Sequence, residues 1–396
     1  MKRIGLYLGF PPEDGGAFQY AQSVLEALAN FPPSRYEIVV ACSNSAWFLT
    51  LEKYNDRFEY LKVHLTYRDF FISGILRFGL SLSLWRSIAG FAHRLSRLLI
   101  TQHCDLWIFP AQDIWTYAIP TTNLGVIHDL MHRYEPRFPE VSTFGLFCRR
   151  ERHYRRICQH AQGVLVDSEV GKQQAMDSYH IDADQFHVLP FVAPTYVHSN
   201  LVPTDFDQRY QLPERFIFYP AQFWMHKNHI RLLQAMASIR HALPDLHLVL
   251  VGSKKNGYSS VVKEIVRLDL QDRVQILGYV PEGDIPILYR RALALIMPTF
   301  FGPTNIPPLE AMAIGCPMAV SNIYAMPEQV GDAALLFNPL SVSEIAEAIL
   351  NLATEEKLRQ QLTEAGKKRA ALWGQAQFND RLLKIIEMIV KECGYA

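Results

Sequence analysis

Short apolar runs alternate with helical patterns along almost the whole of this chain of 396 residues. The runs are too short for most buried helices and have the look of buried parallel strands. They lie at 4–8, 38–41, 106–109, 125–127 and 164–166, and then at 216–219, 248–251, 274–277, 293–297, 318–320 and 335–337. Helical spacing is clearest at 18–29, 141–159, 230–242, 259–268, 285–291, 342–352 and 355–372. Such alternation predicts α/β architecture, with parallel sheets covered by helices on both faces.

The length of the chain favours two domains. Residues 192–213 contain prolines and aspartates that interrupt every periodic pattern, so we place the boundary there. We expect a first doubly wound, Rossmann-like domain at 1–195 and a second at 210–374. A final amphipathic helix within 375–396 is expected to pack back on the first domain. Two such domains facing each other would leave a deep cleft, with ligands at the carboxyl ends of the strands.

Composition excludes several classes of protein. Lys+Arg and Asp+Glu balance at 39 each, which argues against a nucleic-acid partner because that needs excess positive charge. The six cysteines are scattered, as expected for reduced thiols of a cytoplasmic protein. No Asp-x-Asp motif follows a strand and no His/Asp cluster has ligand spacing, so we expect no metal and no cofactor. Residues 1–8 indicate a first strand, not a signal peptide.

The most apolar stretch is 70–100, but arginines such as Arg77 and Arg86 interrupt it, so it is not expected to span a membrane. Two interpretations remain open. The stretch is either a helix whose arginines face water or an amphipathic helix lying on a membrane. The basic-aromatic run 149–156 is either a solvated surface or a second contact with anionic headgroups.

The segment 299–317 follows an apolar strand and predicts a loop leading into a short helix. Pro307 or Pro308 suits the first helical position, Thr304 or Asn305 suits the cap, and Gly315 followed by Pro317 ends the helix. Free N–H groups at such a helix start attract anions, of which diphosphate is the commonest. Glu310 is expected in the first turn. It either complements the helix dipole or accepts hydrogen bonds from vicinal hydroxyls.

Other polar groups also follow predicted strands. Lys227 stands in His-Lys-Asn between a strand and a helix, where it could bind diphosphate. Gly15 and Gly16 form either a plain turn or a close backbone approach to a ligand. Their spacing is not G-x-G-x-x-G, which disfavours a nicotinamide cofactor. His128 and Asp129 follow another strand, and a structural role for His128 is as reasonable as a functional one.

Several of these motifs together resemble one known family. Gly302-Pro-Thr-Asn-Ile-Pro-Pro-Leu-Glu-Ala-Met-Ala-Ile-Gly-Cys-Pro317 resembles the donor-binding signature of glycosyltransferase family 4, retaining enzymes of the GT-B fold that use sugar nucleotides. Tyr219-Pro-Ala-Gln-Phe-Trp-Met-His-Lys-Asn228 looks like the phosphate-binding loop of that family. Val126-Ile-His-Asp129, Val164-Leu-Val-Asp-Ser168 and Leu277-Gly-Tyr-Val280 fall in the same order and spacing. The resemblance covers essentially the whole chain and is strongest over 215–340.

The resemblance implies roles for individual residues. Lys227 would hold the diphosphate, Glu310 the ribose hydroxyls and His128 the donor sugar, while Asp129 is an alternative base. Two positions depart from the family pattern, because Gly302 stands where a first glutamate is usual and Gln222 where an arginine is usual. The complete predicted donor site comprises Gly15, Gly16, Gln222, Lys227, Gly252, Ser253, Tyr279, Val280, Pro303, Thr304, Asn305, Ile306 and Glu310.

The function that the resemblance implies is transfer of a mannosyl or glucosyl group, without a metal, in polysaccharide or O-antigen synthesis. GDP-mannose is the first expected donor and a UDP-hexose the second. The acceptor would be a saccharide or lipid-linked saccharide, reached in the cytoplasm with peripheral contact at the inner membrane. Two alternatives remain open: a non-catalytic partner that binds sugar nucleotides, and a sugar-nucleotide epimerase.

Overall fold

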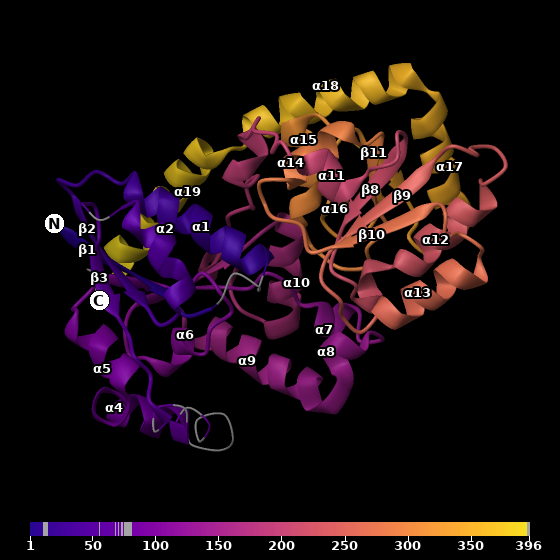
Figure 1. The fold of residues 1–396 in the computed structure, drawn as a ribbon. Helices are drawn as coiled ribbons and strands as arrows, with labels where there is room; N and C mark the ends of the chain where they lie inside the picture. The colour runs from indigo at the N-terminus through magenta and orange to yellow at the C-terminus, as the bar shows by residue number, and fades with distance from the viewer. Residues whose placement is uncertain are drawn as a thin grey trace. The chain divides into compact units, whose positions relative to one another are not determined.

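The computed structural model describes residues 1–10, 15–54, 56–67, 69, 71–72, 74 and 81–393. The chain divides into two compact units (Figure 1). The first contains the described residues of Met1–Leu130, Cys148–Pro190 and Gln375–Ala396, and the second contains Met131–Phe147 and Phe191–Gly374. The segment 131–147 clusters with the second unit, although the predicted first domain, 1–195, included it.

The first unit is built on a seven-stranded parallel sheet in the order β3-β2-β1-β4-β5-β6-β7. Its strands are β1 (Lys2–Leu8), β2 (Tyr36–Cys42), β3 (Glu59–Lys62), β4 (Leu106–Ile108), β5 (Asn123–Val126), β6 (Gly163–Val166) and β7 (Phe186–Val188). Its helices include α1 (Gly16–Ala29), α2 (Phe48–Glu52), α4 (Leu82–Ala92), α5 (Arg94–Thr101), α6 (Trp115–Ala118), α9 (Leu146–His160), α10 (Glu169–Tyr179) and α19 (Gln375–Cys393).

The second unit repeats the plan with a six-stranded parallel sheet in the order β10-β9-β8-β11-β12-β13. Its strands are β8 (Phe216–Pro220), β9 (His247–Val251), β10 (Val274–Gly278), β11 (Ala294–Met297), β12 (Met318–Ser321) and β13 (Leu335–Phe337). Its helices include α7 (Met131–Tyr134), α8 (Pro139–Ser142), α11 (Phe206–Tyr210), α12 (His229–Ser238), α13 (Tyr258–Arg267), α14 (Ile285–Arg291), α15 (Ile306–Ile314), α16 (Met326–Val330), α17 (Val342–Thr354) and α18 (Glu356–Leu372).

The predicted fold class is confirmed, since both sheets have the doubly wound order in which the chain reverses direction beside its first strand. The central strands are buried on both faces because helices cover each sheet, which explains their continuous apolar runs. Helix α19 belongs to the first unit, and the side-chain amide of Gln375 donates to the backbone carbonyl of Ser23 on α1.

No helix in the described part of the chain is long and apolar enough to cross a bilayer. Within the stretch 70–100, residues 70, 73 and 75–80 lie outside the described residues. Residues 11–14, directly before Gly15 and Gly16, also lie outside them.

Candidate functional site

Two loops of the second unit extend from neighbouring strands at the point where the sheet order reverses. Strands β8 and β11 pair directly, with Ile217 beside Ala294 and Phe218 beside Leu295. The segment 221–228 follows β8 and the segment 298–305 follows β11. In open α/β sheets this reversal point at the carboxyl ends of the strands is where ligands bind. Both predicted phosphate-binding segments therefore lie at the expected place.

The β8 loop is held by its own side chains. Asn228 adopts a left-handed conformation with φ of 59°, and its side-chain amide donates to the carbonyls of Pro298 at 2.9 Å and Pro339 at 2.8 Å. The hydroxyl of Tyr219 donates to the backbone carbonyl of Lys227 at 2.9 Å. These bonds fix the backbone at the carbonyl of Lys227 and at the next residue, so the lysine side chain starts from a defined position.

The structure brings Lys227 and Asn305 together. The Nζ atom of Lys227 donates to Oδ1 of Asn305 at 3.2 Å. These residues are 78 positions apart in the sequence, and they come from the two loops at the reversal point. An ammonium group held beside the start of α15 is a suitable fixed charge for a diphosphate group.

The N-cap of α15 is Asn305, one of the two predicted caps, but the first helical residue differs from the prediction. The helix begins at Ile306, so Pro307 and Pro308 occupy its second and third positions and Glu310 lies beyond the first turn. Neither proline has an N–H, and the N–H of Asn305 already donates to Oε1 of Gln329 at 2.9 Å. The helix therefore offers fewer backbone donors than sequence analysis assumed. Its end is as predicted, because Gly315 follows it in a left-handed conformation.

Glu310 is only 4% exposed and is held by two tyrosines that sequence analysis missed. Its Oε2 accepts from the hydroxyl of Tyr289 on α14 at 2.6 Å, and its Oε1 accepts from the hydroxyl of Tyr196. Burial raises the pKa of Glu310, and the two hydrogen bonds only partly offset this. Tyr196 lies 114 residues away from Glu310, and no local sequence signal identifies it.

Gly302, where the family pattern has glutamate, is required by the backbone. Its φ is 126°, and an added Cβ would lie 2.2 Å from Nδ2 of Asn305. That amide donates to the carbonyl of Phe301 at 3.0 Å, while its oxygen accepts from Lys227. A side chain at 302 would thus displace the residue that contacts Lys227. Pro303 is buried beside it, and Thr304 is half-buried in the same loop.

The remaining predicted donor residues of this unit follow β8, β9 and β10. The Oε1 atom of Gln222 accepts from the indole of Trp224 at 2.9 Å. The N–H of Gly252 donates to the carbonyl of Gly278 at 2.8 Å, and Ser253 follows it, half-buried. Tyr279 is 78% exposed, whereas the side chain of Val280 is buried. Any contact that Val280 makes with a ligand must therefore use its backbone.

Gly252 provides a test of how tightly these loops pack. Its φ is 148°, and an added Cβ would lie 2.3 Å from the carbonyl oxygen of Ala221, in the loop that leads to Lys227. We expect Gly252→Ala to destabilise the protein by about 2–4 kcal/mol in chemical denaturation. Gly283→Ala is the matched control, because an added Cβ there would have open space. Equal stability of the two variants would contradict this packing.

The other predicted residues lie in the first unit. Gly15, with φ of 60° and ψ of −111°, caps α1, and Gly16 is the first residue of that helix. His128 follows β5, its two ring nitrogens are enclosed, and its ring lies 5.0 Å from that of Tyr20 on α1. Burial lowers the pKa of His128 to about 4, so its imidazole is neutral at pH 7.

Asp129 has a basic neighbour in the same unit. Its Oδ1 lies 3.7 Å from Nη1 of Arg150 on α9.

The described residues were also compared with the requirements of a metal site. Among the residues that the structure describes, no group of three or more His, Cys, Asp or Glu side chains is arranged to hold a metal ion.

The sequence profile of one family, described as glycosyl transferases group 1, matches residues 204–369. These residues contain both loops at the reversal point, including Lys227, Asn305 and Glu310. The matched residues make up less than half of the chain, and they are similar to a glycosyl transferases group 1 domain.

Two curated relatives are similar to part of this chain. O-antigen chain mannosyltransferase B of Escherichia coli is 30% identical over 165 residues, which are 41% of this chain and 43% of the relative. O-antigen chain mannosyltransferase RfbU of Salmonella typhimurium is 28% identical over 196 residues, which are 49% of this chain and 51% of the relative. The matches thus span about half the length of these relatives.

Solved structures match over almost the full length. Anabaena Alr3699/HepE, crystallised with UDP and glucose, superposes with a TM-score of 0.74 and 17% identity, covering 98% of this chain and 100% of that one. A glycosyltransferase from Rickettsia africae gives a TM-score of 0.72 at 16% identity, covering 98% and 99%. The likeness confirms the predicted GT-B fold of two Rossmann-like domains.

Proposed function

We propose that the chain is a retaining hexosyltransferase that moves a mannosyl or glucosyl group from a nucleotide-diphosphate sugar to a saccharide acceptor. The observation that carries this proposal is the contact between Lys227 and Asn305 at the reversal point of the second sheet. The two relatives that are named O-antigen mannosyltransferases support a mannosyl donor, with GDP-mannose first. The UDP in the HepE structure supports a UDP-hexose as the second candidate.

In this proposal Lys227 stabilises the charge that develops on the departing diphosphate. The bond from C1 of the sugar to the phosphate oxygen breaks while the acceptor oxygen bonds to C1 on the same face. The acceptor proton passes to an oxygen of the leaving diphosphate, so no enzymic base is required. Fixed charge acting where negative charge develops is a common source of catalysis, and it needs no metal here.

His128 would donate or accept a hydrogen bond with a sugar hydroxyl, which suits an imidazole that is neutral at pH 7. Asp129 is the weaker candidate for a base, because Arg150 lies within ion-pair distance of its carboxylate. Glu310 would accept from the ribose hydroxyls. Each of its oxygens accepts one hydrogen bond from a tyrosine and retains a second lone pair for a ligand.

The test is an assay of the purified chain with GDP-mannose, UDP-glucose and UDP-N-acetylglucosamine, each with EDTA and with a saccharide acceptor. Transfer with retained anomeric configuration supports the proposal. Binding of a nucleotide sugar without turnover would instead support a non-catalytic partner. Interconversion of the donor sugar without release of nucleotide would support an epimerase.

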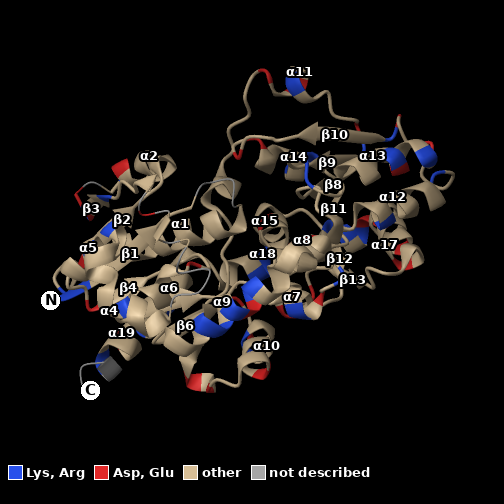
Figure 2. Cartoon of the chain, turned by 90° about the horizontal axis from the view of Figure 1, so that it is seen from below, with Lys and Arg blue, Asp and Glu red and all other residues tan. Residues whose placement is uncertain are grey.

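A second observation favours a lipid-linked acceptor at a membrane surface. On α4, Leu84, Ile88 and Phe91 are 53%, 40% and 89% exposed, and their spacing places them on one helix face. Arg86 on α4 lies 3.5 Å from a ring nitrogen of His160, at the end of α9. Figure 2 shows Lys and Arg positions along α9, which include the exposed residues Arg149, Arg152 and Arg155.

We therefore propose that α4 inserts its exposed face into an anionic membrane while α9 contacts headgroups. Flotation with vesicles containing phosphatidylglycerol should recover the protein at low salt. The double variant Ile88→Ser/Phe91→Ser should reduce the floated fraction severalfold. Leu340→Ser, which removes an exposed apolar side chain from the second unit, is the control. Absence of flotation at low salt would contradict the membrane proposal and leave the transfer reaction unaffected.

A further inference from the structure

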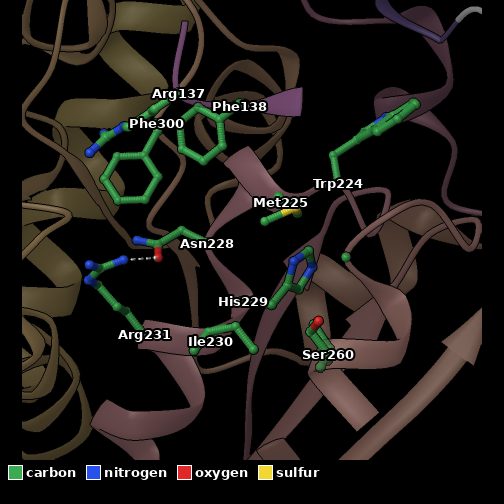
Figure 3. A pocket seen from close by; sticks show the side chains of 12 residues that line it. Arg137, Phe138, Trp224, Met225, Asn228, His229, Ile230, Arg231, Ser260 and Phe300 are labelled. Carbon is green, nitrogen blue, oxygen red and sulfur yellow. Dashed lines mark hydrogen bonds between the residues drawn. The ribbon is translucent and has the colours of Figure 1, made fainter. Parts of the chain in front are cut away.

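A cavity of about 340 Å³ lies on the second unit, beside the loop that carries Lys227. Its walls come from the 131–147 segment, from the β8 loop and the first turn of α12, from the first turn of α13, and from Phe300. Figure 3 shows these side chains arranged around it. None of the predicted donor-binding residues lines the cavity. A space of this volume with mixed polar and aromatic walls is suited to a small molecule.

Two guanidinium groups share one aromatic ring in this cavity. The guanidinium carbons of Arg137 and Arg231 lie 4.5 Å and 5.5 Å from the centre of the Phe300 ring. Nε of Arg137 pairs with Glu135 at 2.7 Å, and Nη1 of Arg231 donates to the amide oxygen of Asn228 at 3.2 Å. Within the described part of the chain, Arg231 has no carboxylate partner and Arg137 pairs only through Nε. The pair therefore carries excess positive charge that an anion could neutralise.

Helix polarity adds to this charge. The cavity is lined by His229, Ile230 and Arg231 from the first turn of α12, and by Ser260 from the first turn of α13. Neither helix has a side-chain cap, and helix starts carry partial positive charge. Both helix starts and both guanidinium groups thus favour a negatively charged group. The geometry resembles phosphate sites more than sites for neutral sugars.

A buried imidazole also lies in the cavity wall. His229 is 2% exposed, and its ring is stacked on Phe223 with centroids 4.7 Å apart. Its ring nitrogens make no hydrogen bond of standard geometry to any described residue, although the carbonyl of Ala221 is near. Burial lowers the pKa of His229 to about 3, so the ring is neutral and retains a polar atom for a ligand.

The remaining wall of the cavity is uncharged and partly aromatic, and it indicates what the uncharged part of the ligand is. Phe138 is buried, with its ring 5.5 Å from that of Phe300, and Trp224 lies at the edge of the cavity (Figure 3). Aromatic faces of this kind pack against the C–H face of a sugar ring. We propose that the cavity binds a phosphorylated sugar, with Arg137 and Arg231 holding the phosphate and the aromatic side chains holding the ring.

This proposal does not depend on the proposed transfer reaction. Titration calorimetry would compare mannose 6-phosphate and glucose 6-phosphate with mannose, inorganic phosphate and glucuronate. We expect a hexose phosphate to bind, and at least tenfold weaker binding of mannose, inorganic phosphate and glucuronate. Arg231→Met and Arg137→Met should each weaken hexose phosphate binding by about tenfold, roughly the strength of one charge-assisted hydrogen bond.

Two controls locate the ligand. Lys263→Met removes an exposed charge from α13 without touching the cavity lining and should bind as the wild type does. Lys227→Met should also retain hexose phosphate binding, because Lys227 does not line the cavity. Loss of binding in Lys227→Met alone would assign the ligand to the donor site and overturn the proposal. Absence of binding, or equal binding of inorganic phosphate or glucuronate, would also overturn it.

Discussion

Lys227→Met should reduce sugar transfer by roughly 100- to 1,000-fold in kcat/KM, equivalent to about 3–4 kcal/mol of transition-state stabilisation. The lysine side chain is a positive charge at the reversal point of the second sheet, and its bond to Asn305 links the two loops there. The backbone of Lys227 would remain bonded through its carbonyl to Tyr219, so the loop should keep its shape. The measurement is initial-rate kinetics with the preferred donor.

The control for this variant is Lys357→Met, which removes an exposed charge on α18 in the same unit. It should leave transfer unchanged. Addition of EDTA should leave the wild-type rate unchanged as well, because we propose that fixed charge stabilises the leaving diphosphate without a metal. A Lys227→Met variant with wild-type kcat/KM would remove this residue from the mechanism.

Glu310→Ala should lower the free energy of unfolding by about 2–4 kcal/mol, because it removes the acceptor of two buried tyrosine hydroxyls. The hydroxyl of Tyr196 would lose Glu310, and that of Tyr289 would keep only the carbonyl of Pro307 at 3.3 Å. Glu310→Gln should fold normally, since an amide can accept from one tyrosine and donate to the other. Urea denaturation of the three proteins measures both effects. Equal destabilisation by alanine and glutamine would contradict the role of the tyrosine pair.

The difference in the free energy of unfolding between the wild type and Glu310→Gln should also depend on pH. Burial raises the pKa of Glu310 in the folded state, so the folded state favours the protonated acid. The stability that this preference contributes is present below the ordinary carboxyl pKa and is lost as pH rises through the raised pKa. Glu310→Gln should therefore gain stability relative to the wild type between pH 4 and pH 8. A relative loss of stability over that range would contradict the raised pKa.

Much of the fold could be predicted because both sheets are parallel and covered on two faces. Buried strands such as 248–251 then appear as uninterrupted apolar runs. The two missed strands lack that signal. The edge strand β3 has no buried residue, and β7 has only three residues, with a half-buried histidine at its centre. Periodicity cannot identify strands of that kind.

Candidate site residues could be predicted only where the local sequence shows that they stand between a strand and a helix. Lys227 follows a strand and precedes a helix, so its place at the reversal point could be expected. The tyrosines that hold Glu310 come from distant segments, and their contact depends on packing that no local pattern encodes. The start of α15 was wrong by one or two residues, because proline is compatible with several positions of a first helical turn.

The most direct test of the account compares the binding of a nucleoside diphosphate with that of the matching nucleoside. The comparison uses the base of the preferred donor and measures wild type and Lys227→Met by calorimetry. If Lys227 holds the diphosphate, the variant should lose at least tenfold in affinity for the diphosphate and nothing for the nucleoside. Equal affinity of both proteins for the diphosphate would contradict the central claim.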